Sequence, residues 1–405
     1  MSTTRTALVI GGGVAGPVAA MALQKAGIEA TVFEAYGGVA DGIGGGLGMA
    51  ANGQRALAVL GAEHAVTGIG TPMTAMVMTS WNGKELAELG DPPGLPGTRF
   101  VWRADLYRAL YDEAIRRGIR IEHGRRLVSA RSTSDSVTAE FDGGTTASAD
   151  VLIGADGLWS AVRGQIDPAA PQPRYGGLIS LGVKVAHTSV PPTGGKMHMV
   201  FGKKAFFGYQ VEADGTGSWF VNLPHREPMT LAQARAVPRR KWLDALREVV
   251  AEDRTPALRM VEETDPAELL IVGPMLDLPS VPAWSRGRMV LVGDAAHAPT
   301  SSSGQGASLA IESAVQLARC LRDLPHDEAF AAYEGLRRAR VEKIIANGAR
   351  TNSEKAAGPV ARVLRDLLLP MAMKTLAKPE KMAWQFAYEI DWNATVNAAP
   401  VPVAS

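Results

Sequence analysis

The stretch TALVIGGGVAGPVAAMALQKAGIEATVFE, residues 6–34, decides the fold. Its first five residues form an apolar run typical of a buried parallel strand, a glycine cluster follows at once, and a helical pattern then continues to Lys25. In such a unit Gly11 allows a tight turn, Gly13 lets the backbone approach a pyrophosphate, and Gly16 lets the helix pack closely on the strand. The sequence therefore predicts a βαβ dinucleotide-binding unit with phosphates at the helix N-terminus.

An acid closes this unit. Glu34 follows the second strand, predicted at residues 30–33, and lies 18 residues (34 − 16) after Gly16. That spacing is close to the roughly 20 residues expected for an acid that binds ribose hydroxyls. Because a carboxylate repels a 2′-phosphate, Glu34 favours an unphosphorylated adenosine, as in FAD or NAD.

Two further strand ends carry an acid. An apolar run at residues 151–154 leads to Asp156, and MVLVGDAAHAPTSSSGQGASLA, residues 289–310, runs from a strand through Asp294 into a Ser/Gly-rich loop and a helix. Ligands of open α/β sheets bind along the carboxyl ends of the strands. A loop of such small residues indicates a ligand pressed against backbone.

A second glycine-rich segment spans residues 36–48. Such a segment is either an idle flexible loop or passes close to a flat ligand. Asn52 is predicted to be the N-cap of a helix at residues 54–60.

An amphipathic helix is predicted at residues 105–117, with Leu106, Leu110 and Ile115 facing inward. Arg103 lies just before this helix. The residues alone leave two interpretations open: a phosphate contact or a solvated surface arginine.

The middle of the chain changes character, with strand-like runs linked by Pro and Gly turns. This pattern favours an antiparallel sheet over further βαβ units. We expect a discontinuous nucleotide-binding domain of residues 1–75, 98–176 and 271–330, a β-rich domain of residues 76–97 and 177–270, C-terminal helices at 331–395 and a tail at 396–405.

Composition excludes several classes of protein. The 42 Lys and Arg residues nearly balance the 41 Asp and Glu residues, which gives no electrostatic case for a nucleic-acid or anionic-membrane partner. No uninterrupted apolar run reaches the roughly 18 residues of a membrane span. The single cysteine, Cys320, excludes an intrachain disulfide and a cysteine-cluster metal site. We therefore expect a cytoplasmic protein without a metal site.

Three motifs occur in a recognisable order: GGGVAG at 11–16, GADGLWSAVR at 154–163 and GDAAH at 293–297. Together they resemble the class A FAD-dependent monooxygenases, the p-hydroxybenzoate hydroxylase-like family of aromatic hydroxylases. VWRADLYRAL at 101–110 is similar to that family's Arg-x-x-Leu helix, and the resemblance covers roughly residues 5 to 340. It implies an α/β fold with a split Rossmann-like (GR2-type) FAD-binding domain, an inserted β-rich substrate domain and C-terminal helices.

The resemblance implies one bound FAD, with NADPH or NADH as a co-substrate that binds transiently over the flavin. It assigns the FAD pyrophosphate to Gly11, Gly13, Ala15 and Gly16. It assigns the adenosine ribose to Glu34.

The flavin half of the cofactor would meet other residues. On the family pattern Arg103 contacts the phosphate–ribitol region, and Asp294 binds a ribitol hydroxyl. Asp156 belongs to a motif that links FAD binding to the use of the nicotinamide cofactor. The backbone that would face the pyrimidine edge of the flavin ring belongs to Gly306, Ala307 and Ser308.

Three residues depart from the family pattern. Ser301 stands where a proline is usual, Ser308 where an asparagine lies near the ring, and Ser313 where the following helix carries an acid. These differences bear on the position and mobility of the flavin more than on its binding.

The implied reaction consumes NAD(P)H and inserts one oxygen atom of O2, through a C4a-hydroperoxyflavin, into an aromatic or polycyclic small molecule. A flavin epoxidase or Baeyer–Villiger-type oxygenase and a non-catalytic flavin-binding protein are the alternatives. The catalytic acid–base residue is unassigned: Tyr209 and His225 are candidates, whereas His297 is interpreted as structural. A monomer or homodimer is expected.

Overall fold

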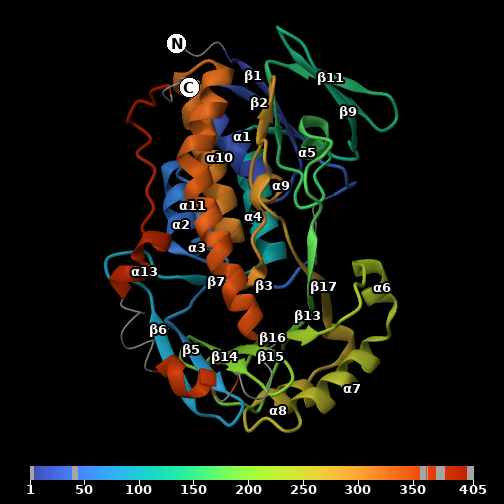
Figure 1. Cartoon of the computed structure of the whole chain (residues 1–405), viewed down its shortest axis with the longest axis vertical. Coiled ribbons are helices and arrows are strands. Elements are labelled where there is room, and N and C mark those ends of the chain that lie inside the picture. The colour runs from blue at the N-terminus through green and yellow to red at the C-terminus, as the bar shows by residue number, and fades with distance from the viewer. Residues whose placement is uncertain (1–3, 39–43, 356–361, 363, 371–378, 399–405) are drawn as a thin grey trace.

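The computed structural model of the protein describes residues 4–38, 44–355, 362, 364–370 and 379–398. Two large sheets organise it. In Figure 1 a six-stranded sheet and its helices occupy the upper part, and a seven-stranded sheet lies below them. Part of the glycine-rich segment (39–43) and most of the predicted tail (399–405) lie outside the described residues.

The six-stranded sheet is parallel except at one edge. Its central strand pairs in parallel with the strands on both sides. The sheet consists, in spatial order, of β18 (Ser285–Arg286), β19 (Met289–Leu291), β12 (Val151–Gly154), β1 (Thr6–Ile10), β2 (Glu29–Phe33) and β8 (Arg120–Glu122). Strands β12 and β19 are buried along their whole length because parallel sheets are covered on both faces.

The motifs meet at one edge of this sheet. The Gly11 amide donates to the Phe33 carbonyl at 2.8 Å, and the Ala155 amide donates to the Ile10 carbonyl at 2.8 Å. The Val292 amide donates to Gly154 at 2.9 Å. The ladder thus continues past the strand ends and brings the three loops together.

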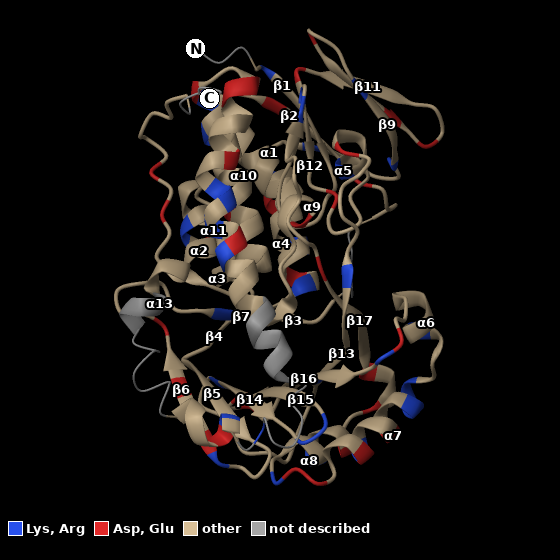
Figure 2. Ribbon diagram, in the orientation of Figure 1, with Lys and Arg blue, Asp and Glu red and all other residues tan. Residues whose placement is uncertain are grey.

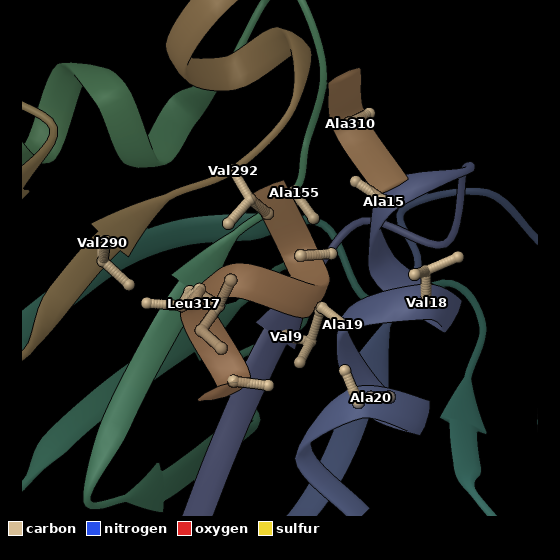
Figure 3. Close-up of a cluster of buried hydrophobic side chains, with 14 of the residues drawn as sticks. Val9, Ala15, Val18, Ala19, Ala20, Ala155, Val290, Val292, Ala310 and Leu317 are labelled. Atoms are coloured by element: carbon tan, nitrogen blue, oxygen red, sulfur yellow. The ribbon is translucent and has the colours of Figure 1, made fainter. Parts of the chain in front are cut away.

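Small residues let the helices approach this edge. α1 (Ala15–Lys25) packs against α10 (Gly306–Asp323), and Figure 3 shows Ala19 of α1 and Ala310 and Leu317 of α10 in one cluster with valines of the strands. Gly293 lies at the crossing: a Cβ there would be 3.1 Å from the Cβ atoms of both Ala15 and Ala310. A larger residue would push the two helices apart.

The seven-stranded sheet is formed by two separate stretches of the chain. Its strands, in spatial order, are β17 (Leu270–Asp277), β13 (Arg174–Val185), β16 (Gly217–Pro224), β15 (Phe206–Val211), β14 (Lys196–Phe201), β5 (Ala75–Ser80) and β6 (Glu85–Gly90). Only β14 and β5 pair in parallel. One face packs against three helices, α6 (Leu231–Ala236), α7 (Arg239–Val250) and α8 (Ala257–Glu262).

Two smaller sheets complete the strands. One is β3 (Gly46–Met49), β7 (Arg99–Trp102) and β4 (Thr71–Pro72), and the other is β9 (Leu127–Ser132), β10 (Val137–Phe141) and β11 (Thr146–Ala149). Other α-helices among the described residues are α2 (Ala51–Val59), α3 (His64–Thr67), α4 (Arg103–Arg116), α5 (Ala161–Ile166), α9 (Asp294–His297), α11 (His326–Lys355) and α13 (Pro379–Phe386), and residues 364–370 are also helical.

Two local predictions are wrong. α2 begins at Ala51 after an N-cap at Ala50, so Asn52 lies inside the helix. α4 buries Leu106 and Leu110, but Ile115 is 45% exposed. The buried stripe continues at Ala114, four residues after Leu110, as a period of 3.6 residues requires.

Charged residues of both signs are interspersed over the molecule, as Figure 2 shows, and they alternate along α11. Within the described part of the chain, no helix combines the length and the apolar character needed to cross a bilayer.

Candidate functional site

In the glycine turn after β1, Gly11 and Gly16 are closely packed, whereas Gly13 is not. A Cβ at Gly11, where φ is +107°, would lie 2.5 Å from the Ala155 carbonyl oxygen, and one at Gly16 would lie 1.8 Å from the Gly11 carbonyl oxygen. A Cβ at Gly13 would meet no protein atom within 4 Å. Gly11 and Gly16 are therefore required by packing, whereas Gly13 borders open space.

The N-terminus of α1 points its amides at this space. No side chain caps the helix, and its first turn, which includes Ala15, holds no acid. Uncapped N–H groups and the positive end of the helix dipole form a binding place for an anion.

Glu34 lies against the same turn. Its carboxylate accepts hydrogen bonds from the Gly12 amide at 2.6 Å and the Tyr36 amide at 2.9 Å. These two bonds fix the carboxylate at the end of β2, next to the glycine cluster.

Asp294 follows Gly293, whose φ of +61° turns the chain from β19 into α9. The side chain remains exposed to solvent, yet protein surrounds it closely enough that desolvation raises the pKa of its carboxyl, against the charge of Arg103. An accessible acid in crowded surroundings is expected of a group that lines a ligand site.

Arg103 opens α4 and donates its backbone amide to the Gly45 carbonyl at 3.1 Å. One helical turn later lies Tyr107. Burial raises the pKa of Tyr107, and the charges of Arg103, Asp294 and Glu34 all act on it. The structure therefore gathers one arginine and two acids from α4, α9 and the end of β2 around one tyrosine.

The N-terminus of α10 provides a second set of free amides. Its first turn, from Gly306, holds no acid and no side-chain cap. Gly306 and Ala307 are partly exposed, whereas Ser308 is fully buried with its hydroxyl 3.6 Å from the Met49 sulfur. The Ser308 hydroxyl thus lies against the end of β3, and it also packs on Gly53 of α2, where a Cβ would be 2.6 Å away. Residue 308 can therefore meet a ligand at this helix end only through its backbone.

These features fit FAD. Gly13 and α1 leave room and donors for a pyrophosphate, Glu34 and Asp294 offer acceptors for hydroxyls, and the α10 amides offer donors for ring oxygens.

Asp156 has a local role. It accepts hydrogen bonds from the Ser160 hydroxyl at 2.5 Å and the Val162 amide at 3.1 Å, and so caps α5. Burial raises its pKa, although these bonds oppose the shift. Arg163 of the same motif is buried and donates to the Ala295 carbonyl at 3.0 Å, which ties the motif to GDAAH.

Asn52, predicted from the sequence to be a helix cap, is instead fully buried and bridges α2 and α10. Its amide donates to Gln305, the N-cap residue of α10, at 2.9 Å and to Glu312 at 2.5 Å. It therefore anchors the helix end that would face the flavin. The Asn52 side chain joins α2 to α10, and a contact between helices so far apart in the sequence leaves no local sequence pattern.

Glu312 is a fully buried acid of α10, one residue before Ser313. It forms ion pairs with Arg337 at 2.5 Å and Arg340 at 2.9 Å, both on α11. Burial raises its pKa, but these arginines outweigh burial and lower it. The sequence signal is one acid within the otherwise uncharged stretch 306–318 of the helix, since a buried acid needs partners.

His297 is buried and connects to the same cluster. The Ser313 hydroxyl lies 2.8 Å from His297 Nε2 and accepts from Arg337 Nε at 3.2 Å. Burial, with the Arg337 charge, lowers the pKa of His297 to about 3. The imidazole is neutral, as its structural interpretation requires.

The two acid–base candidates lie apart. The Tyr209 ring belongs to the core between the seven-stranded sheet and α7, where it stacks on His198 at 4.9 Å and burial raises its pKa to about 12. This placement disfavours a catalytic role. His225 lies just beyond β16, with Nδ1 2.7 Å from the Glu227 carbonyl, and remains a prediction.

Comparisons with known proteins identify the family of the whole chain. The FAD binding domain family matches residues 4–348. A 3-amino-4-hydroxybenzoate 2-monooxygenase of Streptomyces platensis is 32% identical over 397 residues and is aligned over 94% of this chain and 95% of its own length. An aurachin C monooxygenase/isomerase of Stigmatella aurantiaca is 29% identical over 370 residues, which are 86% of this chain and 89% of that one. The structure of Klebsiella pneumoniae HpxO with FAD and uric acid has the same fold, with a TM-score of 0.81 at 24% identity over 96% of this chain and 98% of that one.

The fold and the site define a flavoprotein oxidoreductase. The chain belongs to the FAD binding domain family and is an FAD-dependent monooxygenase. The predicted family, fold class and cofactor are thereby confirmed.

Proposed function

We propose that FAD lies along the carboxyl edge of the six-stranded sheet. The pyrophosphate is held by Gly11, Gly13, Ala15 and Gly16 at the α1 N-terminus, and the adenosine ribose by Glu34. The open space at Gly13 and the uncapped amides of α1 support this assignment.

The flavin half continues past Arg103 and Asp294 to α10. Asp294 accepts from a ribitol hydroxyl, and Arg103 neutralises nearby phosphate charge. The backbone of Gly306, Ala307 and Ser308 faces the pyrimidine edge, where the helix dipole stabilises negative charge on the ring. Asp156 acts through α5, whose motif is bonded to GDAAH, rather than by direct contact.

The bound FAD supplies the redox chemistry, since it can accept a hydride from NAD(P)H and activate O2. The protein contributes position and shelter from water. We place an aromatic or heteroaromatic substrate between the flavin edge and the seven-stranded sheet, and expect one oxygen atom to enter it. The names of the relatives, among them a hydroxybenzoate monooxygenase, support a ring substrate.

The observation that carries the proposal is the convergence of Glu34, Arg103 and Asp294 around Tyr107, beside two uncapped helix ends. The test is NADH or NADPH oxidation by the FAD-loaded protein in air, with a panel of phenols and hydroxylated heterocycles, using isotopically labelled O2. We expect oxidation that a ring substrate accelerates, with label in the product. Absence of oxidation with both nucleotides would contradict the proposal.

A further inference from the structure

The seven-stranded sheet has one face without helices α6–α8. Alternate residues of β13, β15 and β16 enter the core beneath those helices, so the residues between them point the other way. On β17, Val272 lies on this second face, 3.3 Å from where a Cβ of Gly45 would stand. Gly45 belongs to the loop beside Arg103, so this face looks toward the proposed flavin site.

Asn222 lies near the centre of that face. It pairs across the sheet with Ser180 on β13 and Phe206 on β15, and it is only 3% exposed. Among the described residues, no group hydrogen-bonds its carboxamide, and its polar atoms are not sealed inside protein. The carboxamide is thus nearly buried, has no protein partner and is still accessible, so it can hydrogen-bond a ligand that covers this face.

The surroundings of Asn222 are aromatic and apolar. The next row of the same face holds Phe220, flanked by glycines on both neighbouring strands. A Cβ at Gly208 would lie 2.2 Å from the Phe220 ring, so the ring covers Gly208. Met199 follows on β14. Such a surface suits a flat ring.

The charged groups near Asn222 are either paired with an opposite charge or lie farther along the sheet. Of the described residues, those in the two central rows of this face carry no ionisable group. Arg365 lies over the Phe201 ring at 4.4 Å, farther along the sheet, but it is paired with Asp366 at 2.9 Å. A carboxylate bound beside Asn222 would lose its hydration without gaining a cation.

We propose that the substrate is an uncharged aromatic or heteroaromatic ring with a hydroxyl or lactam group, and that Asn222 selects it. The carboxamide can donate to a ring oxygen and accept from a ring O–H or N–H. This rests on the proposed function. It separates the chain from the Streptomyces relative, whose named substrate is a benzoate.

Matched neutral and anionic probes test this selection: 4-hydroxybenzamide against 4-hydroxybenzoate, and 2-quinolone against quinoline-2-carboxylate. Each is titrated into the FAD-loaded protein, and binding is followed by the change in flavin absorbance. We expect at least one neutral probe to bind at least about tenfold more tightly than its anionic match. Tighter binding of both carboxylates, or no binding of either neutral probe, overturns the proposal.

The variant Asn222→Leu keeps the size of the side chain and removes the hydrogen bonds. This variant should bind the neutral probe about tenfold more weakly and should leave the FAD dissociation constant unchanged. Ser218→Ala, on the same strand and face, is the matched control and should change neither. Equal binding of the neutral probe by Asn222→Leu and the native protein overturns the proposal. Probe binding without NAD(P)H oxidation would instead contradict the oxygenase function alone.

Discussion

The cofactor edge of the six-stranded sheet and the face of the seven-stranded sheet opposite α6–α8 are built in opposite ways. The first consists of backbone: glycines, uncapped helix ends and one acid on each of two loops. The second consists of side chains on regular strands, centred on Asn222 and Phe220. A backbone-lined site requires particular residue types, such as glycine, at fixed spacings in the sequence. In a site lined by side chains, a single substitution can change which ligand binds.

The strongest test of this comparison is the pair Gly16→Val and Gly13→Val. At Gly16 the new side chain meets the Gly11 carbonyl oxygen, because a Cβ there would be 1.8 Å away. We expect a loss of about 3 kcal/mol or more in the free energy of unfolding. Urea unfolding of the FAD-free protein measures it.

Gly13→Val serves as the contrast, since no protein atom lies within 4 Å of its Cβ position. Unfolding of the FAD-free protein should change by less than about 0.5 kcal/mol, while FAD affinity falls about tenfold or more. Equal destabilisation by both variants would show that Gly13 also serves packing.

Asp294→Ala should lower FAD affinity by about 10- to 100-fold, because a hydrogen bond to a charged group contributes about 1.5 to 3 kcal/mol. The protein should purify largely colourless. FAD content from the absorbance spectrum measures this, with the exposed Asp135→Ala as control. Full FAD occupancy would remove Asp294 from the site.

His297 predicts a pH dependence of stability. Its pKa is about 3 in the folded protein, below the unfolded value of about 6.5, so the unfolded state binds the extra proton. The contribution of His297 to the free energy of unfolding is fully present above pH 6.5 and is lost as the pH falls toward 3. At pH 5 the loss is about 2 kcal/mol. In His297→Gln the free energy of unfolding should change less between pH 7 and pH 5 than in the native protein. An unchanged pH dependence would show that other groups cause it.

The smallest effect is expected for Tyr209→Phe. Its ring lies in the helix-covered core, so removal of the hydroxyl should leave kcat and KM within about twofold, an effect below 0.5 kcal/mol. Steady-state NAD(P)H oxidation checks this. A fall of tenfold or more in kcat would restore Tyr209 as an acid–base group and weaken the contrast between the two faces of the sheet.

The cofactor edge could be predicted because its constraints are local in sequence. Gly16 is required by the Gly11 carbonyl oxygen, five residues earlier, and the φ of +107° at Gly11 belongs to the turn itself, although Ala155, which also packs on Gly11, comes from far along the chain. Asn52 could not be predicted: its partners, Gln305 and Glu312, lie more than 250 residues away.

The substrate face shows a different limit. The alternation of Tyr209 and Gln210 shows that the two residues lie on opposite faces of β15, but not which face the helices cover. Only the packing of α7 and α8 decides that. The chemistry of a phenol makes Tyr209 an acid–base candidate, and the tertiary structure places its ring in the core beneath the helices.

The strand order has a consequence for how the protein is made. β1 is synthesised first, but its neighbour β12 follows more than a hundred residues later, and β19 begins at residue 289 of 405. Asp294 and α10 are therefore synthesised when about 70 to 80% of the chain is complete. Until then an apolar parallel edge has no partner, and such long-range pairing is slow and prone to aggregation. We expect cofactor loading to be a late event, and nascent chains to need protection until α10 has closed over α1.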